Sequence, residues 1–142
     1  MARVHLIDEL SYDAAMAIVS HGVDLVEVAR IASLVDEHGQ RFLDRCFTSA
    51  EQSYAHDNRR RAEHLAGRFA AKEAVLKALG TGLSDGIAWT DVEVVRLDSG
   101  KPTIRLHARA LEIAQGLGIE RWHLSISHTS GHAMASVVAE GS

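Results

Sequence analysis

Cysteine and proline are almost absent from this chain of 142 residues, which has one of each. The single Cys46 excludes an internal disulfide and a zinc site built from several thiolates. It also favours a reducing, cytoplasmic setting. Aromatic residues make up 5% of the chain, so we expect a core made mainly of leucine, valine, isoleucine and alanine.

Long apolar runs and an excess of positive charge are missing as well. No run of about eighteen apolar residues occurs, so we expect no membrane-spanning helix and no membrane partner. Asp8, Glu9 and Asp13 interrupt the start of the chain and exclude the apolar core of a signal peptide. The net charge of −4 argues against general nucleic-acid binding, so an acidic partner would need a local basic patch.

What remains is the composition of an ordinary globular domain, with 46% hydrophobic and 24% charged residues. The length suits one domain. We assign residues 1–16 to an N-terminal extension whose order the sequence leaves open, and residues 17–142 to the domain. Met16 is an alternative start.

Hydrophobic periodicity in the first half predicts one strand and several helices. The stretch from Ala17 to Val26 is typical of a strand with a bulge or a close backbone approach at Gly22. A helix then runs from Glu27 to Gly39, and a short one over residues 41–47. The inward residues expected in these two helices are Val28, Ile31, Leu34, Val35, Phe42, Leu43, Cys46 and Phe47.

Two further helices follow. Thr48 and Glu51 form a capping box that opens a helix ending near His56. The basic run Asn58–Arg61 is interpreted as solvated surface. A longer helix spans 65–82, with Leu65, Phe69, Leu76 and Leu79 inward and a glycine cap at its end.

The second half predicts a hairpin, a helix and another hairpin. The first hairpin covers 91–107 and the second covers 122–140. The helix between them, over 108–118, is expected to turn Leu111, Ala114 and Leu117 inward. Together these elements predict an α+β fold, an antiparallel sheet with helices packed on one side.

Glu73 and Lys77 lie four residues apart, so they share one side of the helix over 65–82. They are either an exposed ion pair, contributing about 0.3–0.5 kcal/mol, or groups with a chemical role. Strand alternation should turn Asp24 away from Val23 and Leu25. Asp24 poses the same choice, because it could face water or cap the following helix. If that strand packs beside the helix, Asp24 and Glu73 converge as hard oxygen ligands for Mg²⁺, the usual partner of a diphosphate. Lys77 would then meet a phosphate or accept a proton.

Ser127 and His128 end a predicted strand. Adjacent side chains of a strand point to opposite faces, so these two cannot form a nucleophile–base pair. His128 and His132 across a turn are weak evidence for zinc. A hydrogen-bonding, surface or phosphate-binding role suits His128 better.

Four segments together resemble the holo-[acyl-carrier-protein] synthases, the short type of 4′-phosphopantetheinyl transferase. They are GVDLVEVARI, GRFAAKEAVLKALGTG, SGKPTIRL and LSISHTSGHAMASVVAE, which occur in the family's order within residues 17–140. The resemblance implies Mg²⁺-dependent transfer of 4′-phosphopantetheine from coenzyme A to a serine of apo-acyl carrier protein, releasing adenosine 3′,5′-bisphosphate. It makes Asp24 and Glu73 the protein ligands of Mg²⁺ and, with Lys77, the catalytic residues.

Longer relatives place a third carboxylate near this metal, whereas Leu25 follows Asp24 here, so a water would complete the shell. The base is either Lys77 or a metal-bound water activated by Glu73. The resemblance also assigns coenzyme A contacts, with Arg68 and His128 near the 3′-phosphate or adenine. The full set is Arg68, Lys77, Gly80, Gly100, Lys101, Pro102, Ser127, His128 and Thr129.

The resemblance further implies an acidic carrier protein docking on Arg30, with Arg41 and Arg45 extending the basic patch. Glu37 and Gln40 stand where relatives often carry further basic residues. A homotrimer with active sites at subunit interfaces is implied too, and it would bury a sheet that one small domain leaves exposed. The alternatives are a coenzyme A- or nucleotide-binding module without activity and an interaction protein that binds neither.

Overall fold

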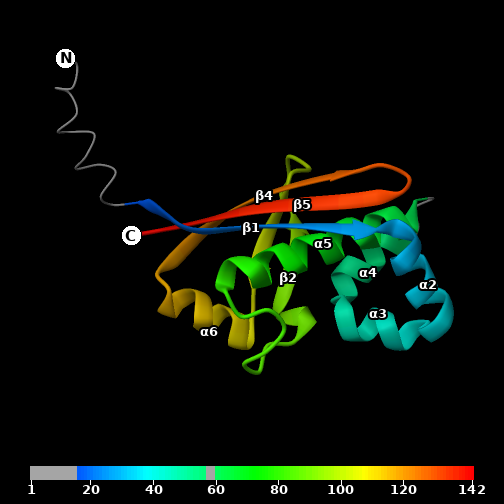
Figure 1. The fold of residues 1–142 in the computed structure, drawn as a ribbon, viewed down its shortest axis with the longest axis horizontal. Coiled ribbons are helices and arrows are strands. Elements are labelled where there is room, and N and C mark those ends of the chain that lie inside the picture. The colour runs from blue at the N-terminus through cyan, green and yellow to red at the C-terminus, as the bar shows by residue number, and fades with distance from the viewer. Residues whose placement is uncertain (1–15, 57–59) are drawn as a thin grey trace, which may run out of the picture.

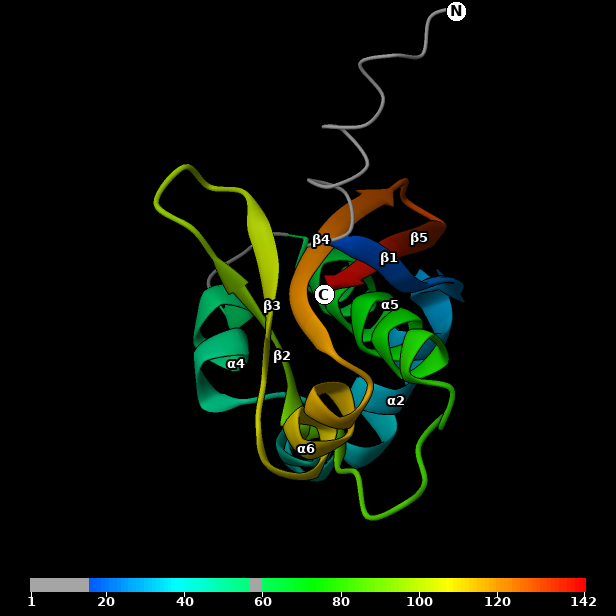
Figure 2. The same cartoon turned by 90° about the vertical axis from the view of Figure 1, so that its left-hand side faces the viewer.

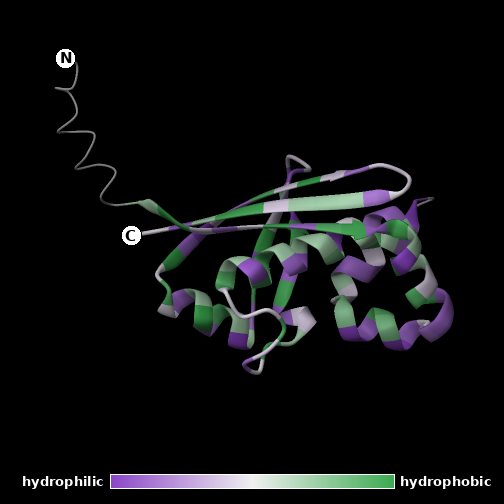
Figure 3. Ribbon diagram, in the orientation of Figure 1, coloured by the Kyte–Doolittle hydropathy of each residue, from purple (hydrophilic) through white to green (hydrophobic). Residues whose placement is uncertain are grey.

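A three-stranded antiparallel sheet lies along one long helix in the computed structural model, which describes residues 16–56 and 60–142 (Figure 1). The strands are ordered β1 (Ala17–Glu27), β5 (His132–Gly141) and β4 (Ile119–His128). The helix α5 (Arg61–Leu79) covers one face of this sheet. Hydrophobic residues follow the strands and α5, where the two layers meet (Figure 3). Residues 1–15 and Asn58–Arg59 of the predicted basic run lie outside the described residues.

Alternation along β1 divides its side chains between two environments. Asp24 and Val26 are buried toward α5, whereas Val23 and Leu25 are 50% and 64% exposed on the opposite face. The prediction that Asp24 points away from its neighbours is therefore confirmed. The inward positions of β5 are mostly alanines, and their small side chains let α5 approach the sheet closely.

Gly22 is the point of closest approach between β1 and α5. A Cβ atom at this position would lie 2.1 Å from the backbone oxygen of Ala74. Of the two predicted alternatives, a bulge or a close approach, the close approach is the one found at Gly22, and the register of β1 shifts between Ile18 and Ser20.

Three helices gather at one end of α5 (Figure 1). They are α2 (Val28–His38), α3 (Gln40–Cys46) and α4 (Ser49–His56), close to the predicted ranges. The capping box of α4 is present: the Thr48 backbone N–H donates to Glu51 Oε1 at 2.9 Å, and the Glu51 N–H donates to Thr48 Oγ1 at 3.2 Å.

The remaining strands form a separate hairpin rather than an extension of the first sheet. After the 3₁₀ helix η1 (Trp89–Asp91), β2 (Val92–Arg96) pairs with β3 (Pro102–Leu106). β3 lies beside β4 (Figure 2), but in the described residues β4 pairs only with β5. The α+β class and both hairpins are confirmed, while the antiparallel sheet is divided in two.

The helix α6 (Ala108–Gly116) packs with a different face from the one predicted. Ala110 and Ala114 are buried, whereas Leu111 and Leu117 are 40% and 46% exposed. The inward face follows Ala110, Ile113 and Ala114 at helical spacing. Leu111 lies off this face and Leu117 lies beyond the last helical residue, so their predicted burial was wrong.

A fully buried ion pair joins α5 to α4 and β2, which the sequence analysis did not predict. Lys72 Nζ lies 2.8 Å from Glu51 Oε1, and both side chains have 0% exposure. Lys72 also donates to the carbonyl oxygens of Val92 and Trp89, and the Val94 N–H donates to Glu51 Oε2 at 2.8 Å. These bonds offset the cost of burying two charges.

No helix in the described ranges is long and apolar enough to cross a membrane.

Candidate active site

Asp24, Glu73 and Lys77 meet where β1 crosses α5. The alternation of β1 turns Asp24 toward the helix, and helical spacing brings Glu73 and Lys77 to the facing turns. Lys77 Nζ donates to Asp24 Oδ1 at 2.9 Å and to the Val23 carbonyl oxygen at 3.1 Å. Lys77 on α5 therefore forms an ion pair with Asp24 on β1. Among the described residues, the Glu73–Lys77 ion pair suggested by the spacing does not form.

The two carboxyl groups are close enough to affect each other. Burial raises the pKa of Glu73 and repulsion by Asp24 raises it further, while Arg30 and Lys77 act in the opposite direction. Asp24 Oδ2 is buried and has no hydrogen-bond partner within the described residues. Two adjacent carboxylates with one uncompensated buried oxygen fit a divalent cation.

The donor set also indicates which cation fits. The described part of the chain contains no cluster of three or more histidine, cysteine or acidic side chains that could hold a metal. Two carboxylates are too few for zinc or calcium but suit Mg²⁺, which keeps several waters and substrate oxygens in its shell. A cavity of about 200 Å³ adjoins Glu73 and Lys77, and its other lining residues are Leu76, Gly82, Leu83 and Trp89.

A second group of predicted residues lies around Arg68. The Arg68 side chain, Pro102 and His128 line one cavity of about 160 Å³. His128 Nδ1 is 3.1 Å from Glu63 Oε1. Gly100 and Lys101 belong to the turn between β2 and β3, next to Pro102. Ser127 and Thr129 flank His128 and are exposed.

Within the part of the chain that the structure describes, these two groups line different cavities. Arg68 and Glu73 are five residues apart on α5, so they point about 140° from each other around the helix axis. Accordingly, the cavity beside Glu73 and the cavity beside Arg68 have no lining residue in common. Gly80, which caps α5 with a φ of 80°, lies at the Glu73–Lys77 end.

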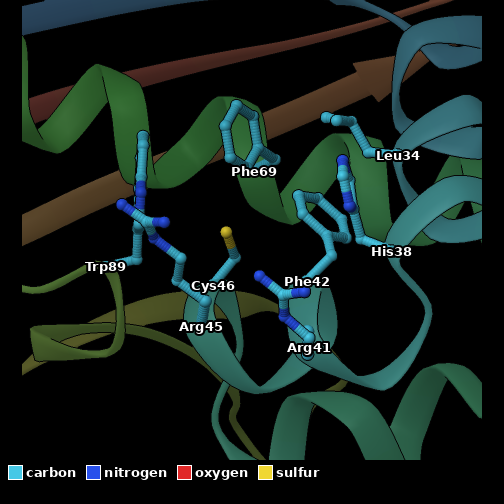
Figure 4. Close-up of a pocket in the computed structure, with 8 residues that line it drawn as sticks. All are labelled: Leu34, His38, Arg41, Phe42, Arg45, Cys46, Phe69 and Trp89. Carbon is cyan, nitrogen blue, oxygen red and sulfur yellow. The ribbon is translucent and has the colours of Figure 1, made fainter.

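A third cavity, of about 320 Å³, opens beside α3 (Figure 4). Arg41 and Arg45 reach it from α3, and Phe69 and Trp89 line it from α5 and η1. Arg30 on α2 is exposed, and its Cζ lies 5.8 Å from the Phe69 ring centroid. The complete lining is Leu34, His38, Arg41, Phe42, Arg45, Cys46, Phe69 and Trp89. Arg41 and Arg45 thus line this hollow together with several apolar side chains, and Arg30 lies near it, over the Phe69 ring.

Sequence reasoning missed several residues near these cavities. Tyr54 and Arg96 lie beside Arg68, and Trp89 contributes to two cavities. The burial of Lys72 could have been predicted, because Lys72 lies on the same face of the helix as Leu65, Phe69 and Leu76. A lysine among inward residues indicates a buried charge with a partner.

Comparison with known proteins identifies the class. The family model of the 4′-phosphopantetheinyl transferase superfamily matches residues 20–135. The holo-[acyl-carrier-protein] synthase of Koribacter versatilis is 49% identical over 123 residues, covering 87% of this chain and 98% of that relative. The chain therefore belongs to the holo-[acyl-carrier-protein] synthase family of this superfamily, which confirms the resemblance.

Solved structures agree with this assignment. The holo-[acyl-carrier-protein] synthase of Neisseria meningitidis aligns with a TM-score of 0.78 and 34% identity, covering 87% of this chain and 98% of that one. A holo-(acyl-carrier-protein) synthase from Bacillus anthracis in complex with CoA (3′,5′-ADP) has a TM-score of 0.73 and 38% identity, covering 90% of this chain and 100% of that one.

Proposed function

We propose that the chain transfers 4′-phosphopantetheine from coenzyme A to a serine of apo-acyl carrier protein, in a Mg²⁺-dependent reaction, through a domain spanning residues 17–142. The observation that carries this proposal is the meeting of Asp24, Glu73 and Lys77 where β1 crosses α5. Family membership and the CoA-bound relative from Bacillus anthracis supply the substrate class.

The reaction is a displacement at phosphorus. The carrier serine oxygen forms a bond to the phosphorus that bears pantetheine, and the bond from this phosphorus to the bridging oxygen of the diphosphate breaks. Adenosine 3′,5′-bisphosphate leaves with that oxygen, and the serine proton passes to a base. The nucleophile belongs to the partner, which agrees with the lack of a nucleophile–base pair in the sequence.

Asp24 and Glu73 are proposed to hold Mg²⁺, which supplies charge neutralisation on the diphosphate when bound. Asp24 Oδ2, buried and without a hydrogen-bond partner among the described residues, and the raised pKa of Glu73 both suit carboxylates that would hold a cation. Lys77, now paired with Asp24, is 57% exposed and can turn its ammonium group to the diphosphate or to the serine proton. The two candidate acceptors of that proton are Lys77 and a water activated by Glu73.

The cavity beside α3 supports the docking of an acidic carrier protein. Arg41 and Arg45 would pair with its acidic side chains, while Phe69 and Trp89 offer an apolar floor for a hydrophobic side chain. Arg30 extends this surface toward Glu73, whose pKa it lowers. A carrier seated on these residues would bring its serine to the end of α5 where Glu73 and Lys77 lie.

A homotrimer with composite active sites explains why the predicted coenzyme A contacts are divided between two faces of α5. One chain would supply Asp24, Glu73 and Lys77, and a neighbouring copy would supply the Arg68 and His128 group. The outer face of the three-stranded sheet supports such an assembly, because Val23, Leu25 and Met134 are 50%, 64% and 44% exposed there. We place this enzyme in the cytoplasm, where a single buried thiol remains reduced.

Mass spectrometry tests the activity directly. Apo-acyl carrier protein incubated with the chain, coenzyme A and Mg²⁺ should gain the mass of one phosphopantetheine, and chelation of the metal should prevent the gain. A serine-to-alanine carrier protein is the matched control. No mass gain with several carrier proteins would contradict the proposed activity, and Mg²⁺-dependent binding of coenzyme A without transfer would favour a binding module.

A further inference from the structure

Tyr54 contacts two guanidinium groups at once. Its ring centroid lies 4.7 Å from Arg68 Cζ and 4.5 Å from Arg96 Cζ. Both distances are within the roughly 6 Å over which an aromatic ring attracts a cation. The three side chains come from α4, α5 and β2, so this cluster exists only in the folded chain.

Two arginines held this close oppose each other. Burial lowers the pKa of Arg68, and the positive charge of Arg96 lowers it further, against the influence of Tyr54 and Glu51. Arg68 is only 5% exposed, and its Nε has no hydrogen-bond partner among the described residues. A bound anion would stabilise this arrangement. It would reduce the repulsion between the two guanidinium groups and accept a hydrogen bond from the Arg68 Nε–H.

The cavity that both arginines line is suited to an anion. Among its described lining residues, Glu63 is the acidic one, and it is engaged by His128 at 3.1 Å. Burial lowers the pKa of His64, and Arg68 lowers it further, so His64 adds little positive charge beside the two arginines. The volume of about 160 Å³ admits a group of phosphate size. The full lining is Glu63, His64, Gly67, Arg68, Arg96, Pro102, Ile126 and His128.

Arg96 is also fixed from the other side. One of its terminal nitrogens, Nη1, donates to the Gly100 carbonyl oxygen at 2.8 Å. Gly100 begins the Gly-Lys-Pro turn, so Arg96 connects that turn to Tyr54. A guanidinium held by a ring and a carbonyl loses little freedom when it binds a ligand.

We propose that Arg96 is the second guanidinium, beside Arg68, for the terminal 3′-phosphate monoester of coenzyme A, and that Tyr54 is the positioning residue that holds the two arginines together. This inference rests on the proposed function, since it takes coenzyme A as the substrate. A phosphate monoester carries nearly two negative charges and accepts paired hydrogen bonds from a planar guanidinium. Arg96 and Tyr54 then determine the preference for coenzyme A over 3′-dephospho-coenzyme A.

Kinetics with these two substrates test the proposal. Arg96→Leu should raise the KM for coenzyme A about tenfold or more, with kcat nearly unchanged, and should leave the KM for 3′-dephospho-coenzyme A as in the unmodified chain. Tyr54→Leu should raise the KM for coenzyme A by a smaller factor with the same selectivity. Tyr54→Phe keeps the ring and is the matched control, with both KM values unchanged.

Calorimetry separates this inference from the activity. The unmodified chain should bind adenosine 3′,5′-bisphosphate more tightly than adenosine 5′-monophosphate, and Arg96→Leu should remove most of that difference. An equal loss toward both nucleotides, or no loss, would overturn the inference. If the unmodified chain binds the bisphosphate selectively but transfers nothing, the proposed function fails while the anion site stands.

Discussion

At the scale of single residues, the proposed active site gathers groups that are unfavourable without a ligand. Asp24 Oδ2 is buried and has no partner within residues 16–56 and 60–142, and Glu73 has a pKa raised by burial and by Asp24. Arg68 and Arg96 repeat this pattern with the opposite sign of charge. Such groups destabilise the ligand-free fold but favour the binding of a ligand of opposite charge, a combination that is common at functional sites.

Glu73→Gln should abolish transfer while the protein remains folded. The raised pKa means that ionised Glu73 destabilises the metal-free fold above that pKa, so removal of the charge should leave the melting temperature at neutral pH equal or higher. Mass spectrometry of the carrier protein and thermal melts by circular dichroism measure the two effects. Near-normal activity of the Glu73→Gln variant would show that Glu73 is not a ligand of the metal.

Glu93 provides a pH-dependent contribution to stability away from the active site. Burial opposes its ionisation, but hydrogen bonds from His107, at 2.9 Å, and Thr48, at 2.9 Å, outweigh burial and lower the pKa of Glu93. The contribution of Glu93 to the free energy of unfolding is therefore fully present above its pKa in the unfolded chain, about 4.3. It is lost as the pH falls through the lower pKa of Glu93 in the folded protein.

Glu93→Gln should therefore reduce the free energy of unfolding at about pH 6. The difference from the unmodified chain should shrink as pH falls below about 4. Urea denaturation at a series of pH values measures it. A difference that stays constant over this range would show that the carboxylate charge is not the stabilising feature.

At the scale of elements, the crossing of β1 and α5 positions the proposed metal site. Gly22 lets the strand approach the backbone of α5, and Asp24 follows two residues later on the same face. The buried Lys72–Glu51 pair fixes the opposite side of α5 to α4 and β2. The helix that carries Arg68, Glu73 and Lys77 is thus held between two layers.

Gly22→Ala should destabilise the protein by about 3 kcal/mol or more, because the new methyl group would overlap the Ala74 carbonyl oxygen. Separation of β1 from α5 should also weaken Mg²⁺-dependent activity in the molecules that remain folded. Urea denaturation and the carrier-protein assay measure these two results.

Gly116→Ala is the matched control, since its added Cβ would have no described atom within 4 Å apart from its chain neighbours and the adjacent backbone of α6. It lies in α6, where alanine should be neutral or stabilise the helix by about 0.5–1 kcal/mol. Equal effects of the two substitutions would contradict a steric role for Gly22.

At the scale of the whole molecule, one chain presents the parts of the proposed coenzyme A site on different sides of α5. The sheet opposite α5 exposes apolar residues, and the basic surface beside α3 lies at the helical end of the molecule (Figures 1 and 4). Assembly of several copies through the sheet would both cover the apolar face and join the two parts.

Subunit complementation tests this arrangement. Glu73→Gln and Arg68→Met chains should each be inactive alone. In trimers refolded from an equal mixture, about a quarter of the interfaces would combine an intact Glu73 with an intact neighbouring Arg68, so activity should return to about that fraction. Light scattering should give the mass of three chains. No recovery in mixed trimers would place the whole site within one chain.

The sequence by itself determined the local structure and the family. Strand alternation placed Asp24 on the opposite face from Val23 and Leu25, glycine caps ended α2 and α5, and the capping box opened α4, because all of these depend on neighbours within a few residues. Motif order was enough for the holo-[acyl-carrier-protein] synthase family, which the comparisons then confirmed.

Only the tertiary structure decided which distant residues meet. It paired Lys77 with Asp24, buried Lys72 against Glu51, and brought Arg68 and Arg96 to Tyr54. It also divided the strands into two sheets and turned Leu111 outward. These contacts depend on how layers pack, and periodicity within one segment carries no information about the segment that will cover it.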